Sequence, residues 1–489
     1  VVLALAALWA GSDPPAAGPA EVVILHTNDL HGRAWSQKAI WLDRDNPPMV
    51  GGLAALAATI RRERARAWNE GKAVVLVDAG DWFQGTPEGD IPRGRLVAEW
   101  MNLVGYDAAT IGNHEFDKGP SILEELHRIA RFPFLGANIA REEGGHPVWR
   151  QGSWTTVAHG TDIVFVGLIS SGMRSLVVPE AIRGFRFGDE VETLRNYLRP
   201  GRVVIPVTHC GVDRDVEIAE ATRVPVIIGG HSHTGLPGGK VSPSGTLIAQ
   251  CWAHGTVLGR VDFRLEGGGV RGATASLVPV RPSDGEDAEA RALVARWAET
   301  VGAEMNVVVG ETAQALTRQG AGSSTLGNWV CDVMRDRAGV QVALTNRTGI
   351  RADLPAGPIR LRDLYEVCPF SNTLVTMELS GADLDSVLEF STGANPVFLE
   401  VSGLEAEIDG AAAAGSRVTV RTVGGEPWDA TRTYRIVTNS FLAAGGDGHL
   451  GLSRGARLVD TGIDTLEALT RAARAGKIAA PLEARLRRR

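Results

Sequence analysis

The stretch VVILHTNDLHGR, residues 22–33, decides the fold, because an apolar run changes abruptly into a polar one. Residues 22–25 are all apolar and mostly β-branched, which is typical of a short strand buried on both faces. The polar part offers a carboxylate and an imidazole two positions apart, Asp29 and His31. Both are common metal ligands. A single Asp-x-His is weak evidence on its own, and a metal site needs further ligands from other strands.

The length and composition indicate a multidomain globular protein. A chain of 489 residues is too long for one hydrophobic core and predicts two or three domains. The net charge of −7 argues against general binding of nucleic acid, which needs basic surfaces. Four scattered cysteines without a CxxC pair are expected to be small buried residues and not a disulfide framework.

The first twenty residues form an apolar run followed by Pro, Gly and Ala. The run is shorter than the ~20 apolar residues that span a bilayer, and it is typical of the end of a secretory signal peptide. We therefore expect residues 1–20 to be a signal-peptide remnant and linker, and the protein to be periplasmic or secreted without a stable membrane anchor. A disordered N-terminus is the alternative.

The remaining sequence divides into three parts. Residues 21–282 alternate apolar strands with helical segments, which predicts an α/β fold around a buried sheet. Residues 283–305 are polar, capped and helical, so we expect a linker helix there. Residues 306–489 carry strands and helices of their own and are expected to form a second domain.

Five predicted strands of the first domain run into loops that contain Asp, His or Asn. In an open α/β sheet the carboxyl ends of the strands meet at one edge, so distant residues can come together there. This mixture of residue types favours Mn, Zn, Fe or Co over a carboxylate cage for Mg or Ca. Seven candidates exceed one tetrahedral site and suit two ions that share a carboxylate. They are Asp29, His31, Asp81, Asn113, His209, His231 and His233.

The motifs ILHTNDLHG, DAGDWFQGT, GNHEFD, THCG and GGHSH resemble the five metal motifs of the calcineurin-like metallophosphoesterases, and HTNDLHG is similar to their 5′-nucleotidase branch. The resemblance implies a four-layered β-sandwich flanked by helices. It also implies two divalent metal ions (Mn, Zn, Co or Mg) bridged by Asp81. One ion would be held by Asp29, His31, Asp81 and His233, and the other by Asp81, Asn113, His209 and His231.

His114 and Asp117 in GNHEFD resemble the catalytic dyad of this family. The resemblance implies that the imidazole contacts the phosphoryl group and helps the leaving oxygen depart, while the carboxylate orients the ring. The two cations would polarise the phosphoryl oxygens and lower the pKa of a bound water for in-line attack. Two nearby residues have simpler interpretations: we expect Glu115 to support a loop or face away from the ions, and His254 to pack.

Residues 345–375 and 434–449 resemble the C-terminal α+β domain of the 5′-nucleotidases, which binds the substrate. Two phenyl rings could sandwich a nucleobase, and stacking contributes ~1–3 kcal/mol. A carboxylate could accept hydrogen bonds from ribose, and a guanidinium could pair with phosphate or ribose oxygens. The candidate substrate-binding residues are Asn346, Arg351, Phe370, Asn372, Phe441, Asp447 and Arg318.

One loop departs from the family pattern. The family usually has Asn-x-Gly-Gly-Ile-Arg where this chain has Asn-Arg-Thr-Gly-Ile-Arg at 346–351. A side chain at Thr348 limits close approach of the backbone, and Arg347 could add positive charge at the rim of the pocket. Relatives often carry further arginines upstream, where this chain offers Arg318.

The combined prediction is an exported hydrolase that cleaves nucleoside 5′-monophosphates to nucleoside and phosphate by metal-activated water. A UDP-sugar diphosphatase or a 2′,3′-cyclic-nucleotide phosphodiesterase would use the same ions. A thiosulfohydrolase-like relative or a non-catalytic binding protein is a more distant alternative. The expected partner is a small-molecule nucleotide and not nucleic acid, the oligomeric state stays open, and the resemblance implies that domain rotation opens and closes the cleft.

Overall fold

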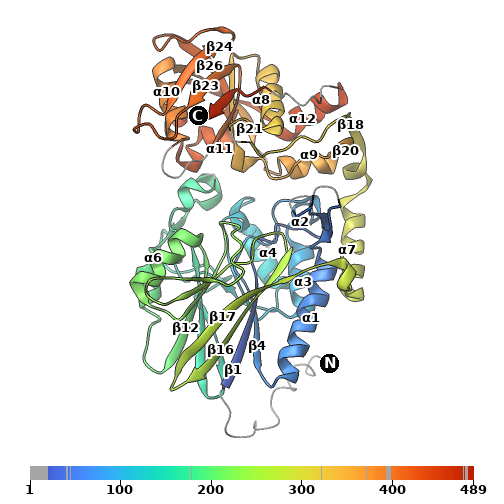
Figure 1. Cartoon of the computed structure of the whole chain (residues 1–489), viewed down its shortest axis with the longest axis vertical. Coiled ribbons are helices and arrows are strands. Elements are labelled where there is room, and N and C mark those ends of the chain that lie inside the picture. The colour runs from blue at the N-terminus through green and yellow to red at the C-terminus, as the bar shows by residue number, and fades with distance from the viewer. Residues whose placement is uncertain are drawn as a thin grey trace.

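The computed structural model describes residues 20–39, 42–43, 46–177, 179–320, 322–370, 372–392, 398–476, 478 and 483–488. Figure 1 shows an N-terminal half, up to strand β17, below a C-terminal half that begins at strand β18. The expected signal-peptide remnant falls in residues 1–20, of which only Ala20 is described. Among the described residues, no helix combines the length and the apolar character needed to cross a membrane.

Two large sheets form the centre of the N-terminal half. The first has seven strands in the order β17 (Gly269–Pro279), β16 (Val257–Glu266), β1 (Ala20–Thr27), β4 (Ala73–Asp78), β5 (Ala108–Thr110), β6 (Phe134–Leu135) and β8 (Arg150–Gln151). The second has six in the order β14 (Lys240–Val241), β15 (Leu247–Ala249), β13 (Val226–Gly229), β12 (Arg202–His209), β10 (Thr161–Ile169) and β9 (Ser153–Ala158). Two strand pairs complete this half: β2 (Gln37–Lys38) with β3 (Met49–Val50), and β7 (Ile139–Arg141) with β11 (Phe185–Phe187).

The strands that matter for the site run parallel. Strands β1, β4, β5 and β6 are parallel neighbours in the first sheet. Strands β10, β12, β13 and β15 are parallel neighbours in the second. Within each sheet the carboxyl ends of these strands therefore lie at one edge, which is where ligands collect in open parallel sheets.

Strand β1 explains why the sheets stack and gain a helical layer. Val22 and Ile24 belong to the core between the two sheets, whereas Val23 and Leu25 belong to the core beneath the helices. All four side chains are fully buried. A strand covered on both faces needs an unbroken apolar run in place of alternation, and the opening stretch supplies one.

Helices cover the outer faces of both sheets (Figure 1). The seven-stranded sheet is covered by α1 (Leu53–Asn69), α3 (Arg95–Val104), α4 (Ser121–Ile129) and α7 (Ala288–Val301). The six-stranded sheet is covered by α5 (Glu190–Arg195) and α6 (Val212–Thr222). The order helix, sheet, sheet, helix confirms the predicted four-layered α/β fold.

The C-terminal half mixes sheets and helices, as predicted. A five-stranded sheet has the order β22 (Leu399–Ser402), β19 (Val342–Asn346), β26 (Thr433–Asn439), β21 (Thr373–Ser380) and β27 (Ala456–Asp464). Helices α8 (Thr325–Ala338), α9 (Leu361–Val367) and α12 (Thr465–Arg474) share one core with it, and α10 (Gly381–Phe390) and α11 (Ser440–Ala443) share another. The smaller sheets are β25 (Glu426–Pro427), β24 (Val418–Val423), β23 (Leu404–Ile408) and β28 (Leu486–Arg488), and the pair β18 (Val308–Thr312) and β20 (Gly357–Arg360).

Helix α7 leads from one half into the other. The carboxylate of Asp287 caps its first turn and accepts a hydrogen bond of 2.9 Å from Ala290 N. The helix packs against α1 and α3 of the N-terminal half, and β18 follows it in the chain. We propose residues 21–282 and 306–489 as the two domains, with 283–305 as the linker. The four cysteines, Cys210, Cys251, Cys331 and Cys368, are all free.

Candidate active site

The seven candidate metal ligands lie at or just beyond the carboxyl ends of five strands: β1, β4, β5, β12 and β13. Five of them are buried, and His231 and His233 are partly buried. The parallel strands bring these residues to one edge, as the sequence pattern implies.

The ligand atoms lie close enough to surround cations. His209 Nε2 lies 3.0 Å from Asp81 Oδ2, and His31 Nε2 lies 3.9 Å from the same oxygen. Asp29 Oδ1 lies 3.3 Å from His233 Nε2 and 3.9 Å from His31 Nε2. The ligand atoms stay within 4.8 Å of one another in three groups: Asp29, His31 and His233; His31, Asp81 and His114; and Asp81, His209 and His231.

Asn113 gives independent support for a cation. Its side-chain Oδ1 is buried and accepts no hydrogen bond from the described residues. Burying a carbonyl oxygen without a donor costs ~1–3 kcal/mol, and coordination to a cation would offset that cost. Together with the imidazoles and carboxylates around it, this oxygen fits a pair of divalent ions of intermediate hardness.

Backbone groups fix the orientation of the ligands. His31 Nδ1 donates to Gln84 O at 2.8 Å, and His209 Nδ1 donates to Ala79 O at 2.7 Å. Because a carbonyl only accepts, Nδ1 of each ring carries a proton, and Nε2 faces the cluster as the atom left to bind a cation. The carboxylate of Asp29 accepts hydrogen bonds from His231 N at 3.2 and 3.0 Å.

The cluster carries ionised carboxylates. Burial raises the pKa of Asp81, but the charges of His209 and His114 outweigh it and hold this pKa well below its usual value. The pKa of Asp29 is likewise lowered, because His233 outweighs the effect of burial. Burial lowers the pKa of His209, but Asp81 outweighs that effect and raises it to about 10. At neutral pH both carboxylates are therefore negative and attract positive charge.

The backbone at the cluster is strained. Five of the seven candidates have positive φ angles: Asp29 (51°), His31 (50°), Asp81 (60°), His231 (78°) and His233 (51°). For residues other than glycine this conformation costs on the order of 1–3 kcal/mol each and persists only where the surroundings enforce it. Such strain gathers at functional sites, which agrees with the candidate role of these residues.

Glu115 joins two of the ligand-bearing loops. Its buried carboxylate accepts hydrogen bonds from Asp81 N at 3.0 Å, Trp82 N at 2.8 Å and Gly112 N at 2.7 Å. Burial, with the nearby charge of Asp81, raises its pKa to about 7. The loops after β4 and β5 are thus tied together, which is the supporting position that the sequence predicts for Glu115.

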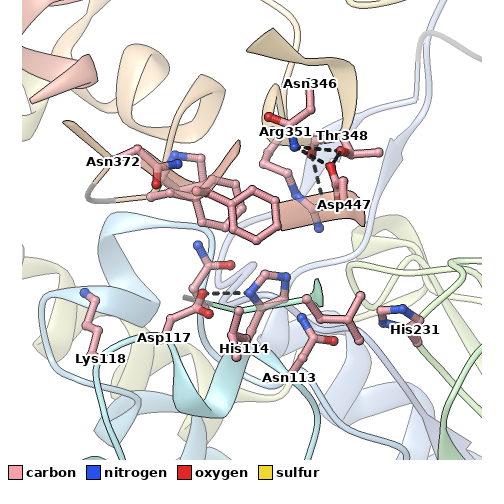
Figure 2. Close-up of a pocket in the computed structure, with 17 residues that line it drawn as sticks. Asn113, His114, Asp117, Lys118, His231, Asn346, Thr348, Arg351, Asn372 and Asp447 are labelled. Atoms are coloured by element: carbon pink, nitrogen blue, oxygen red, sulfur yellow. Dashed lines mark hydrogen bonds and ion pairs between the residues drawn. The ribbon is translucent and has the colours of Figure 1, made fainter. Parts of the chain in front are cut away.

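The predicted dyad is assembled beside the cluster. His114 Nδ1 lies 2.7 Å from Asp117 Oδ2, and His114 Nε2 lies 3.9 Å from Asp81 Oδ2. Burial lowers the pKa of His114, but Asp117 and Asp81 outweigh it and raise this pKa to about 9. Figure 2 shows the dyad on the floor of a cavity, facing residues of the C-terminal half.

This cavity has a volume of about 320 Å³ and is lined by both halves of the chain. That volume lies within the range of small-molecule sites. The N-terminal half contributes Gln84, Asn113, His114, Asp117, Lys118, Leu176, Val177 and His231. The C-terminal half contributes Asn346, Thr348, Gly349, Arg351, Pro369, Phe370, Asn372, Phe441 and Asp447. Six of the seven candidate substrate-binding residues are among these, and Arg318 is not.

Comparison with known proteins identifies the family. The chain matches the family models "Calcineurin-like phosphoesterase" over residues 22–235 and "5'-nucleotidase, C-terminal domain" over residues 304–453. A 5′-nucleotidase of Bos taurus is 30% identical over 91% of this chain and 86% of its own. The chain belongs to the 5′-nucleotidase family. It is therefore a metal-dependent phosphoester hydrolase.

Solved structures agree with this assignment. The crystal structure of a 5′-nucleotidase precursor from Thermus thermophilus matches with a TM-score of 0.86 and 32% identity, covering 96% of this chain and 99% of that one. The sulfate thiohydrolase SoxB of Thermus thermophilus matches with a TM-score of 0.83 and covers 98% of both chains. At 23% identity, the second likeness shows the fold alone.

Two residues of this 5′-nucleotidase-family site escaped the sequence analysis. Arg33 forms an ion pair with Glu366 of the other half, and its charge adds to burial in lowering the pKa values of Arg318 and Arg351. Gln84 is buried and lines the cavity, and its side-chain amide has no hydrogen-bond partner among the described residues. Both lie inside or directly after quoted metal motifs, and that position was the available signal.

The expected positive charge of Arg347 at the pocket rim is wrong. Its guanidinium turns away from the cavity, and its Nε donates to the buried carboxylate of Glu400 at 2.6 Å. A second nitrogen donates to Gly320 O at 2.9 Å. Glu400 therefore neutralises Arg347, and in this loop it is Thr348 that lines the cavity.

Proposed function

We propose that this enzyme hydrolyses nucleoside 5′-monophosphates to a nucleoside and inorganic phosphate, with two divalent ions, outside the cytoplasm. The cavity carries the proposal, because the His114–Asp117 dyad and candidate ligands line it together with the rings of Phe370 and Phe441. A nucleoside monophosphate would place its phosphate at the dyad and candidate ligands and its flat base at the two phenyl rings.

At the phosphate end, the chain's own groups bind and orient. Two divalent ions, when held by the seven candidate ligands, supply polarisation of the phosphoryl oxygens and lower the pKa of the attacking water. Asp117 accepts a hydrogen bond from His114 Nδ1–H, so a protonated ring turns its Nε2–H toward the reacting group. That hydrogen-bond donor can stabilise developing charge or give a proton to the leaving oxygen.

Arginine side chains favour an anion at the same end. Arg351 Nη2 donates to His31 Nε2 at 3.2 Å, which is a nitrogen proposed to bind a metal. A cation on that nitrogen would displace this contact and leave the guanidinium to pair with phosphate oxygens, for which its planar fork is suited. Arg33 and Arg318 bring further positive charge close to Arg351.

At the other end, the groups suit a nucleoside. Two phenyl rings can stack on the base with ~1–3 kcal/mol and little dependence on which base it is. Ser440 Oγ donates to Asn372 Oδ1 at 3.1 Å, so the Asn372 Nδ2 amide faces elsewhere and can donate to the base. The Asp447 carboxylate lines the cavity and can accept hydrogen bonds from the sugar.

A substrate and metal panel tests the proposal. Chelator-stripped enzyme, reloaded with Mn, Zn, Co or Mg, is given AMP, UMP, ADP, UDP-glucose, 2′,3′-cyclic AMP and a thiosulfate compound. Phosphate release is measured and the organic products are separated by chromatography, because the first cleavage of UDP-glucose or of the cyclic nucleotide frees no inorganic phosphate. We expect activity to return only with metal and kcat/KM to be highest for AMP or UMP. A clear preference for UDP-glucose or the cyclic nucleotide would replace the proposed substrate, and hydrolysis of a thiosulfate compound alone would replace the substrate class.

Export is tested separately, by locating the activity in the producing cells. The N-terminal apolar run supports the proposal. We expect the activity in the periplasmic fraction or the medium, and activity confined to the cytoplasm would contradict it.

A further inference from the structure

The loop at residues 346–351 puts a hydroxyl next to the sugar-binding candidate Asp447. Thr348 lines the cavity and donates from Oγ1 to Asp447 Oδ2 at 2.9 Å. Asn346 Nδ2 donates to the same oxygen at 2.7 Å and to Thr348 Oγ1 at 2.9 Å. Figure 2 shows these three residues linked together above the cavity.

The direction of these hydrogen bonds follows from the backbone. Leu442 N donates to Asn439 Oδ1 at 2.8 Å, so the Nδ2 of Asn439 turns to Asn346 Oδ1, at 3.0 Å. Asn346 must then present its own Nδ2 to Asp447 and Thr348. Because the Thr348 oxygen accepts from Asn346, its proton is directed to Asp447 Oδ2.

Asp447 therefore has one oxygen engaged and one available. A carboxylate oxygen has about two lone-pair sites, and both sites of Oδ2 accept protein hydrogen bonds. Oδ1 accepts none from the described part of the chain. A ribose diol pairs best with a carboxylate when each hydroxyl meets its own oxygen. With Oδ2 filled, only Oδ1 can receive a sugar hydroxyl.

We propose that Thr348 is a specificity-determining residue that relaxes selection for ribose, so that a nucleotide lacking one sugar hydroxyl is hydrolysed nearly as well as the ribonucleotide. This inference rests on the nucleotide substrate proposed above. Removing the Thr348 hydroxyl frees one lone pair of Oδ2, and the second sugar hydroxyl then gains a hydrogen bond to a charged group. Such a bond is worth roughly tenfold in binding.

The test compares AMP, 2′-deoxy-AMP and 3′-deoxy-AMP with metal-loaded wild type, Thr348→Ala and Thr348→Ser. For wild type, we expect kcat/KM for one of the two deoxynucleotides to lie within about threefold of that for AMP. In Thr348→Ala the preference for AMP over that deoxynucleotide should rise roughly tenfold. Thr348→Ser keeps the hydroxyl and should keep the wild-type ratio.

Inhibition by the nucleoside products measures the same effect without turnover. Adenosine should gain roughly tenfold in affinity over the matching deoxyadenosine in Thr348→Ala and not in Thr348→Ser. Unchanged ratios in Thr348→Ala would overturn the role of Thr348. A fall in AMP hydrolysis with unchanged deoxynucleotide hydrolysis would overturn it too, because Thr348 would then be positioning Asp447 for ribose.

The two proposals fail in different ways. If metal-loaded wild type hydrolyses p-nitrophenyl phosphate but no nucleoside monophosphate, the proposed substrate fails and the role of Thr348 falls with it. If wild type hydrolyses AMP and no variant moves the ratios, only the role of Thr348 fails.

Discussion

Asp81 is the residue on which most contacts of the site converge. One oxygen lies within 4 Å of His209, His31 and His114, the other accepts a hydrogen bond from His114 N at 3.0 Å, and the backbone N is held by Glu115. The candidate metal ligands and the candidate dyad are thus coupled through one carboxylate. Loss of a dyad group must therefore be separated from loss of metal in any experiment.

The dyad can be tested on that basis. His114→Ala should lower kcat for AMP by about 10²–10⁴, because it removes a positioned acid next to the phosphoryl group. Asp117→Asn, which keeps the shape of the partner, should lower kcat less. Metal content, measured by mass spectrometry, should stay at the wild-type level in both variants. Unchanged turnover in His114→Ala would remove the dyad assignment.

Asp215 provides a prediction about pH. This carboxyl is fully buried, accepts a hydrogen bond of 2.6 Å from Thr208 Oγ1, and has a pKa raised by burial to about 7. Since its pKa is lower in the unfolded chain, the native state binds the extra proton and loses stability as pH rises from about 4 to 7.

Asp215→Asn should remove that dependence. The amide oxygen can still accept from Thr208, but no charge has to be buried. From pH 5 to pH 8, the free energy of unfolding of the variant should gain about 3 kcal/mol relative to wild type. Urea unfolding of both proteins at pH 5 and pH 8 measures the difference. Any pH dependence of metal binding is shared by the two proteins and cancels in the comparison. Parallel pH curves would contradict the assignment.

At the scale of elements, the loops after β4 and β5 pack with no space to spare. A Cβ added to Gly112 would lie 2.2 Å from Asp81 Oδ1, whereas one added to Gly238 would meet nothing within 4 Å. The position of the Asp81 carboxylate therefore depends on a neighbouring loop having no side chain at Gly112.

Gly112→Ala should accordingly lower the metal content and reduce kcat at least about 10-fold, because displaced ligands bind metal less tightly. Gly238→Ala is the matched control and should behave as wild type in both measurements. Full metal content in Gly112→Ala would show that the loop adjusts at no cost to the site.

The sequence predicted these elements because the strands carry strong signals. Strand β1 is apolar at four consecutive positions, and polar ligand types follow it directly. The apolar pattern therefore predicted the helices and sheets of the N-terminal half. The polar residues directly after the strands predicted the candidate metal ligands. Arg33 and Gln84 could not be found in this way, because their roles depend on burial beneath the other half, which has no periodic signature. Arg347 was misjudged because its partner Glu400 lies far away in sequence.

For the whole molecule, ion pairs hold the two halves together around the cavity. Arg33 pairs with Glu366, and Arg362 Nη1 lies 2.9 Å from Glu88 Oε1. Glu88 is almost fully buried, so its pair is less screened than a surface pair. These contacts favour the arrangement of the two halves seen in Figure 1.

The double variant Glu88→Gln/Glu366→Gln should shift the nucleotide-free enzyme toward more open arrangements. Small-angle X-ray scattering should report a larger radius of gyration than for wild type, and added salt should move wild type in the same direction. Glu125→Gln is the control, because Glu125 pairs with Arg93 at 3.0 Å within one half. Equal radii for all three proteins would mean that other contacts hold the two halves in this arrangement.

Because the cavity has walls from both halves, the candidate catalytic residues and the candidate substrate-binding residues are encoded in different stretches of the gene. Recombination could exchange the recognising stretch while the hydrolytic stretch stays intact, and a new preference would then arise without rebuilding a catalyst. The end of α7 is the natural crossover point for such chimeras, since the chain passes there from one half to the other.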